Sequence, residues 1–301
     1  LKGTRGINPL PKGLNESILA GAVEGALVRS MRDCAAVTEV LAIHRHLGGS
    51  FMPSHPPPTL RPQAQVESRP FRIGFCTQAW GSDVKIDSDV QSALAKMAQR
   101  LEHLGHQVIE LSPQDICDFN SLRESFTVAE WLLPISRELM HQVHEANVEL
   151  TDANASIQLR NHLALADRYD VDDLFSAQLE TEELMRRWGA FWQHGPCDLL
   201  LSPVTPITCP EVTASYRMDS DLDFDSWFAA LFDAACFTIP ANHMGLPALS
   251  IPAGLDHNGC PIGMQLMAPW RHEHDLLHLG FQIEQSHPEL FNLKPRHGLH
   301  R

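Results

Sequence analysis

The chain has 301 residues, of which 44% are apolar, so it is long enough to bury a substantial core. Its formal charge of -14 comes from 37 acidic and 23 basic residues, which argues against nucleic acid or an anionic membrane as a partner, because phosphate binding needs clustered Lys and Arg. Seven cysteines without a Cys-x-x-Cys pair fit a reducing compartment better than a disulfide framework or a structural zinc site, and we expect a cytoplasmic protein.

The longest uncharged run covers residues 234–255. Its three prolines and its Asn-His pair make it a poor membrane helix. The first six residues lack the apolar core that a secretory signal requires. We therefore expect no membrane segment.

The first predicted helix begins after Ser30. Asp33 follows three residues later, which is a capping pattern, and apolar residues then recur at helical spacing. These are Met31, Cys34, Ala35, Val37 and Leu41. Residues 54–69 are rich in Pro and polar side chains, and an exposed linker is expected there.

Residues 71–111 predict a strand, a helix and a second strand. Residues 71–76 have strand composition, Asp87 or Ser88 can cap the helix, and Gly105 can close it. Residues 107–111 return as a strand, which completes a βαβ unit. No Gly-rich phosphate loop joins the first strand to the helix, so the sequence argues against a nucleotide site here.

Residues 121–192 have helical composition, with an interruption at Pro134. Trp131 in this region is either a core residue or the wall of a pocket. Residues 197–206 (Cys-Asp-Leu-Leu-Leu-Ser-Pro-Val-Thr-Pro) indicate a buried strand that runs into a loop. Residues 219–225 imitate a calcium loop, but Phe224 takes the position that requires Gly, so a solvated acidic loop is expected.

The most informative stretch covers residues 237–269. Two apolar runs, 248–251 and 262–267, have strand length and flank an Asn258-Gly259 turn signal, which predicts a buried hairpin or two neighbouring strands. Prolines at 240 and 247 fix sharp bends before the first run, and Pro252 follows it directly. Such a loop is typical of places where backbone groups are aimed at a ligand, and the alternative is a rigid turn at the edge of a core sheet.

Residues 242–254 (Asn-His-Met-Gly-Leu-Pro-Ala-Leu-Ser-Ile-Pro-Ala-Gly) and 258–267 (Asn-Gly-Cys-Pro-Ile-Gly-Met-Gln-Leu-Met) resemble the C-terminal hallmark of the amidase signature hydrolases. The resemblance implies an α/β fold in which a mixed β-sheet core is flanked by helices. That family cleaves amides through a Ser, cis-Ser and Lys triad in a Gly/Ser-rich segment. By resemblance this segment belongs before Leu1, so we expect residues 1–301 to be the C-terminal portion of the fold, with an incomplete sheet.

Two further segments resemble parts of that family. Residues 1–6 (Leu-Lys-Gly-Thr-Arg-Gly) are similar to the stretch that follows the nucleophile, with Gly3 in place of the usual Pro. Lys2 then belongs to a post-catalytic stretch, and we expect it to be solvated. Residues 48–53 (Gly-Gly-Ser-Phe-Met-Pro) imitate the context of the nucleophile, but no Gly/Ser-rich stretch precedes them, so we interpret Ser50 as a decoy.

The resemblance also implies a substrate pocket. The helical segment after residue 121 corresponds to a pocket region, the strand at 197–206 ends beside the family's active site, and the hallmark loop completes it. The implied substrate-binding residues are Phe126, Thr127, Ser202, Thr205, Asn242, His243 and Gly245. No catalytic residue, metal or cofactor is expected within the chain.

The residues themselves provide no obvious nucleophile. A Ser–Lys hydrolase needs a lysine kept neutral by desolvation, whereas Lys85 and Lys96 lie at polar positions. Cys236 lies in apolar surroundings, which make a thiol inert. We therefore expect a part of an amidase that is inactive alone and that acts on a small amide when joined to its missing N-terminal half or a complementing chain; a homodimer is left open.

Two alternatives remain. The chain can be a truncated, non-catalytic interaction protein that uses the exposed half-site. It can also be a metal protein, because His274 and His278 lie four residues apart on a predicted helix, with His272 nearby. The tail, residues 287–301, is expected to be loose.

Overall fold

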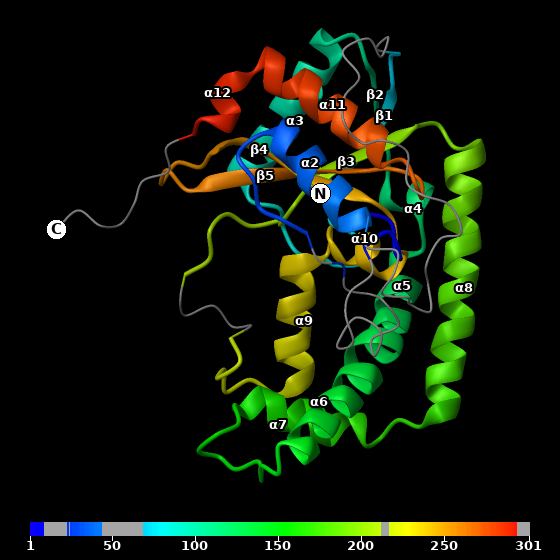
Figure 1. The fold of residues 1–301 in the computed structure, drawn as a ribbon, viewed down its shortest axis with the longest axis vertical. Coiled ribbons are helices and arrows are strands. Elements are labelled where there is room, and N and C mark those ends of the chain that lie inside the picture. Colours follow the sequence, from blue (N-terminus) through cyan, green and yellow to red (C-terminus); the bar gives the residue numbers. More distant parts are fainter. Residues whose placement is uncertain (9–22, 24, 44–68, 212–216, 294–301) are drawn as a thin grey trace, which may run out of the picture.

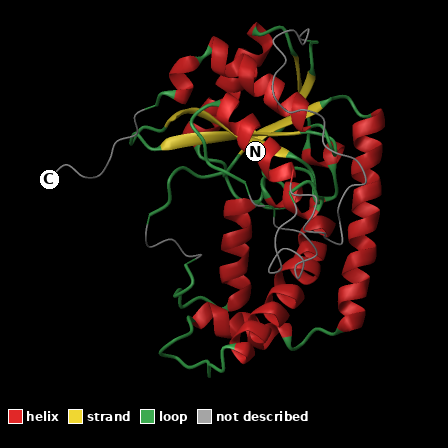
Figure 2. Cartoon of the chain, in the orientation of Figure 1, coloured by secondary structure: helices red, strands yellow, loops and turns green. Residues whose placement is uncertain are grey.

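The computed structural model describes residues 1–8, 23, 25–43, 69–211 and 217–293. Ser50 and the predicted linker up to residue 68 lie outside the described residues. The chain forms a sheet with helices packed around it and, below it in the view of Figure 1, a group of long helices. Figure 2 shows that the strands, in yellow, all belong to the upper part.

Five strands form one mixed sheet in the order β2-β1-β3-β5-β4. β1 is parallel to β2 and β3, while β5 is antiparallel to β3 and β4. The predicted mixed sheet flanked by helices is thereby confirmed. The strands are β1 (Arg72–Phe75), β2 (Gln107–Glu110), β3 (Leu199–Pro203), β4 (Ala248–Leu255) and β5 (Pro261–Met267).

Helices cover the sheet and form the lower group. α2, α3, α11 and α12 lie around the sheet, and α5 to α9 extend away from it (Figure 1). A π-helical segment, η1, joins α5 to α6. The helices are α2 (Met31–Ile43), α3 (Ser88–His103), α4 (Pro113–Ile116), α5 (Phe119–Phe126), η1 (Thr127–Leu132), α6 (Leu133–Glu145), α7 (Ile157–Ala166), α8 (Val171–His194), α9 (Phe224–Ala235), α10 (Ile239–His243), α11 (Glu273–Ser286) and α12 (Pro288–Phe291).

The strand, helix and strand expected within residues 71–111 are β1, α3 and β2. The carboxylate of Asp87 accepts a hydrogen bond from the amide of Asp89 at 2.8 Å and so caps α3. One face of α3 is apolar and buried against the sheet, and the helix ends before Gly105, whose φ is +90°. Parallel pairing of β1 with β2 follows because the helix returns the chain to the starting edge of the sheet.

The predicted hairpin of residues 248–267 is β4 and β5. The amide of Asp256 donates to the carbonyl of Cys260 at 2.8 Å, and Gly259 has φ +82°, a value that favours glycine. Alternate side chains of β4 are buried, and most of β5 is buried on both faces. The hairpin therefore forms one end of the core sheet, with β5 pairing onto the buried strand β3.

The interruption predicted at Pro134 takes the form of η1. Pro134 is the second residue of α6 and has no amide hydrogen to donate to the preceding turn. The turns just before it, Thr127–Leu132, are widened to π-helix, a form that is rare and often found at functional sites. The helical rod continues, but the side chain of Glu130 becomes buried.

Of the tail expected to be loose, residues 287–293 are described and contain a short helix, while residues 294–301 lie outside the described residues. Pro288–Phe291 form α12, which packs against β4 and α11, and Leu290 is buried. Burial of Leu290 stabilises a segment whose Pro and His suggested a loop. No helix within the described ranges is both long enough and apolar enough to cross a bilayer.

Candidate functional site

The hallmark loop begins at the end of α10. Gly245 stops this short helix with φ +69°, a conformation that favours glycine. A Cβ added to Gly245 would lie 2.9 Å from the Cβ of Arg5, which is closer than real Cβ contacts allow. Glycine is required here both by the backbone and by the close approach of the N-terminal segment.

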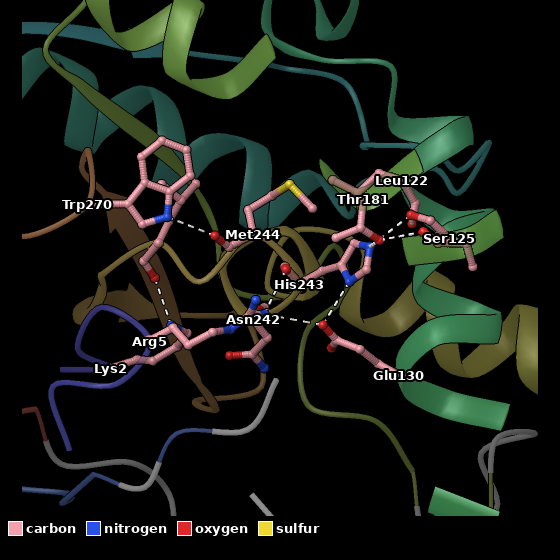
Figure 3. A network of polar contacts seen from close by, with 12 residues as sticks. Lys2, Arg5, Leu122, Ser125, Glu130, Thr181, Asn242, His243, Met244 and Trp270 are labelled. Carbon is pink, nitrogen blue, oxygen red and sulfur yellow. Dashed lines mark hydrogen bonds and ion pairs between the residues drawn. The ribbon is translucent and has the colours of Figure 1, made fainter. Parts of the chain in front are cut away.

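Five successive carbonyl groups of this loop, residues 242–246, accept hydrogen bonds from side chains and backbone of distant segments. The first three residues of the loop are labelled in Figure 3. The donors are Arg5 Nη2 to Asn242 O (3.0 Å) and His243 O (2.8 Å), Trp270 Nε1 to Met244 O (2.8 Å), Arg5 N to Gly245 O (3.0 Å) and Lys2 Nζ to Leu246 O (2.8 Å). Each carbonyl direction is therefore fixed. The loop is held as a rigid element rather than as a simple turn.

A buried polar chain starts from His243, which is completely buried. Its Nδ1 lies 2.8 Å from Glu130 Oε1, and its Nε2 lies 2.8 Å from Ser125 Oγ and 3.3 Å from Thr181 Oγ1 (Figure 3). Arg5 Nη2 reaches the same Glu130 oxygen at 3.3 Å. The carboxylate thus joins the imidazole to the guanidinium, and each buried charge or dipole has a partner.

The sequence of contacts from Ser125 through His243 to Glu130 has the order of a serine–histidine–acid triad. Ser125, however, is only 2% exposed. Its hydroxyl also donates a hydrogen bond to the carbonyl of Leu122 at 3.2 Å. A substrate carbonyl has no room at this oxygen in the described fold. The chain of contacts therefore positions the loop and does not supply a nucleophile.

Lys2 differs from the expectation of a solvated residue. Its ammonium group donates to the carbonyls of Leu246 and Gly3, at 2.8 and 3.0 Å. Burial, followed by the nearby charge of Arg5, lowers the pKa of Lys2 from 10.5 to about 7. The expectation failed because the backbone of Lys2 pairs with Ala248, the first residue of β4, and this pairing brings the Lys2 side chain into the fold.

Ser202 and Thr205 take different positions at the end of β3. Ser202 is buried, and its hydroxyl accepts a hydrogen bond from Gln265 Nε2 at 3.1 Å, while the same amide donates to Phe237 O at 2.7 Å. Thr205 is exposed and donates to the carbonyl of Ile207 at 2.8 Å. Ser202 thus joins two strands to the segment that leads into α10, whereas Thr205 stays in the following loop.

Phe126 and Thr127 lie at the junction of α5 and η1 and face different surroundings. The ring of Phe126 stands edge-on to the imidazole of His243, with centroids 5.7 Å apart. Thr127 lines an open hollow of about 610 Å³ together with Arg123 and Glu124. The structure therefore brings Phe126 together with the hallmark loop and places Thr127 at a separate hollow.

Sequence reasoning missed the partners of His243. A signal for one of them was present, because Glu130 is a single carboxylate within the apolar run 128–133, and such a residue needs a buried partner. Arg5 was recognised only as part of a terminal segment. Trp131, weighed as core or pocket wall, packs against the rings of Phe228 and Phe126, at 5.8 and 6.3 Å, and belongs to the aromatic packing of the lower helices.

The sequence also offered the Cys236 thiol and the histidines at 272, 274 and 278 as candidate groups. Burial raises the pKa of the Cys236 thiol to about 12, in keeping with the apolar surroundings expected for it. His278 does not join His272 and His274: its ring stands beside Phe71, and its Nε2 lies 3.3 Å from Gln282 Nε2. The metal trio considered from the sequence is therefore not assembled, because His278 turns toward the sheet.

A family model named Amidase matches residues 1–277. The chain belongs to the amidase family. The family predicted from the sequence is therefore confirmed.

Among the relatives of this amidase-family chain are proteins named 6-aminohexanoate-cyclic-dimer hydrolase. It is 30% identical to a 6-aminohexanoate-cyclic-dimer hydrolase of Pseudomonas sp. strain NK87 and 30% identical to one of Paenarthrobacter ureafaciens; both alignments cover 96% of this chain and 59% of the relative. A solved structure of 6-aminohexanoate cyclic dimer hydrolase superposes with a TM-score of 0.84 at 24% identity, covering 98% of this chain and 61% of that one. The chain thus spans about three fifths of these relatives.

Proposed function

We propose that this chain is the larger part of an amide hydrolase and that it holds the substrate side of the active site. The reaction converts a carboxylic amide and water into an acid and an amine or ammonia. The observation that supports the proposal most is the amidase match over residues 1–277 together with a loop, 242–246, whose carbonyls are all fixed. A loop held in this way suits the recognition of an amide, because its backbone needs no ordering when substrate binds.

The attacking group comes from residues other than those of the described network. No lysine amine contacts a serine hydroxyl within residues 1–8, 25–43, 69–211 and 217–293. Lys2 has the lowered pKa that a neutral base requires, but its amine is directed at the carbonyls of Leu246 and Gly3. A Gly/Ser-rich segment carrying a Ser, Ser and Lys set supplies the chemistry in this proposal.

The proposed substrate is a small amide, linear or cyclic. Support comes from two relatives that are named 6-aminohexanoate-cyclic-dimer hydrolases and that align with 96% of this chain. The alignments cover 59% of each relative, so the substrate of the joined protein is part of the proposal.

The test compares the purified chain alone with the chain co-expressed with an amidase segment that carries the Ser–Ser–Lys set. We expect no release of amine from a cyclic or linear 6-aminohexanoate dimer by the chain alone, and turnover by the joined pair. A variant, Ser50→Ala, should leave the turnover of the pair unchanged. Turnover by the chain alone that persists in Ser50→Ala would contradict the assignment of the nucleophile.

A second candidate function is a non-catalytic interaction protein. The observation that favours it is an exposed apolar row on α8, made of Val171, Phe175 and Leu179, which are 75%, 65% and 52% exposed. These residues lie four apart and so share one face of the helix. A stable complex of the chain with an unrelated protein, without any amidase segment, would support this function over amide hydrolysis.

A further inference from the structure

The start of α11 brings together two imidazoles and one carboxylate. The donor atoms of His272, His274 and Asp275 all lie within 4.8 Å of one another. His272 Nδ1 is 2.8 Å from Asp275 Oδ2, and His274 Nε2 is 3.4 Å from Asp275 Oδ1. The two imidazole rings stack with centroids 5.4 Å apart, and their nitrogens contact the two different oxygens of the Asp275 carboxylate.

We propose that His272, His274 and Asp275 form a binding site for a divalent transition-metal ion such as Zn²⁺. Two imidazole nitrogens and a carboxylate oxygen are ligands that Zn²⁺ accepts, with bonds of about 2.0 to 2.2 Å. Ligand atoms around such an ion are about 3.4 Å apart. The distance from His274 Nε2 to Asp275 Oδ1 is already 3.4 Å, whereas the 2.8 Å from His272 Nδ1 to Asp275 Oδ2 is a hydrogen bond that must lengthen by about 0.6 Å when the ion enters. The proposal is independent of amide hydrolysis.

The backbone that carries these residues is fixed from outside. Thr4 donates its amide to Glu273 Oε1 at 2.6 Å and accepts at its hydroxyl from the amide of Arg271 at 2.7 Å. Arg271 itself has φ +69°, a conformation uncommon for a residue with a side chain. The positions of the ligand-bearing residues are thereby fixed before any ion binds.

The ligand side chains combine access with support. The side chains of His272 and His274 are 43% and 49% exposed, so an ion can reach them and the rings can rotate by small amounts. Asp275 is 11% exposed and is held by both imidazoles. Two ring nitrogens and one carboxylate leave further positions on the ion open to water.

Arg69 competes with the ion. Its Nη2 lies 3.6 Å from Asp275 Oδ2, and its guanidinium also stacks over the ring of Phe71 at 4.9 Å. A cation beside the carboxylate opposes the arrival of a second cation. Removal of this charge should therefore tighten metal binding, which a site made only of scattered surface histidines would not show.

The experiment is a zinc titration of the full chain by calorimetry, with cobalt(II) absorption as a second measure. We expect one site in the unmodified chain that becomes at least about tenfold weaker in His272→Ala and in His274→Ala. Arg69→Gln should bind about fivefold tighter, as the loss of a nearby unit charge in water implies. Circular dichroism of each variant verifies the fold.

The matched control is His257→Ala. His257 Nδ1 lies 2.7 Å from Asp89 Oδ2, so it forms an exposed imidazole–carboxylate pair without a second imidazole. This variant should keep the zinc site of the unmodified chain. A site of unchanged affinity in both His272→Ala and His274→Ala, or a chain that binds no zinc at micromolar concentration, would overturn the proposal.

Discussion

The carboxylate of Glu130 contacts two groups, the imidazole of His243 at 2.8 Å and the guanidinium of Arg5 at 3.3 Å. Replacement by Ala leaves the buried imidazole and guanidinium without their shared acceptor. We expect Glu130→Ala to lower the free energy of unfolding by about 3 kcal/mol, as is usual when one partner of a buried ionic group is removed. Urea denaturation measures the change.

A control for Glu130 is Glu183→Ala on α8. Glu183 also contacts two cationic side chains, Arg186 and Arg187, but at the surface. Its removal should leave the urea midpoint almost unchanged, since solvent screens exposed pairs. Equal losses of unfolding free energy in the two variants would show that burial adds no stability to the Glu130 contacts beyond that of an exposed ion pair.

The lowered pKa of Lys2 predicts how the free energy of unfolding depends on pH. The pKa of Lys2 falls from 10.5 to about 7 because of burial first and the charge of Arg5 second. Between these two pH values the unfolded chain binds a proton that the folded chain does not, so the Lys2 contribution to stability rises with pH from about 7 to 10.5. Lys2→Met should flatten this rise in a series of unfolding measurements, whereas Lys96→Met on the exposed face of α3 should not.

At the scale of elements, two helical glycines have opposite surroundings. A Cβ on Gly189 of α8 would meet only the ring of Trp270 at 4.0 Å, while one on Gly280 of α11 would lie 2.5 Å from Met31 Cε and 3.0 Å from Leu249 Cδ2. Gly189→Ala should therefore stabilise the protein by about 1 kcal/mol through helix propensity. Thermal unfolding provides the measurement.

The counterpart is Gly280→Val. Larger side chains at Gly280 push α2 and β4 away from α11, so we expect a loss of about 1 to 3 kcal/mol from overpacking. A gain in stability would mean that α2 and α11 do not pack as closely as described.

The segment η1 shows how elements and site are connected. Helical composition and Pro134 predict an interrupted helix, but they do not predict that the interruption consists of π-helical turns. These turns place Glu130 on the buried side, opposite His243. The choice depends on α10 and α8, which supply His243 and Thr181 from distant parts of the chain.

At the scale of the whole molecule, the exposed row of Val171, Phe175 and Leu179 on α8 predicts association, either with a second copy or with another chain. The triple change of these residues to Ser should reduce any dependence of sedimentation mass on concentration. Ser176→Ala, on the same helix but outside the row, is the control. A mass that depends on concentration equally in both variants would exclude the row as the contact surface.

The sequence by itself determined the family, the mixed sheet with flanking helices and the hairpin of β4 and β5. These depend on local signals: the period of apolar residues, the Asn258-Gly259 turn and a long run of family residues. Such signals act over a few residues, so they survive without knowledge of the rest of the fold.

Only the tertiary structure decided the composition of the candidate site. Lys2 and Arg5 reach residues 242–246 across more than 230 positions, and Glu130 meets His243 across 113. The same applies to Asp275, which replaces His278 as the partner of two histidines because His278 faces the sheet. Contacts between distant segments depend on how the layers pack, and a single sequence carries no local signal for that packing.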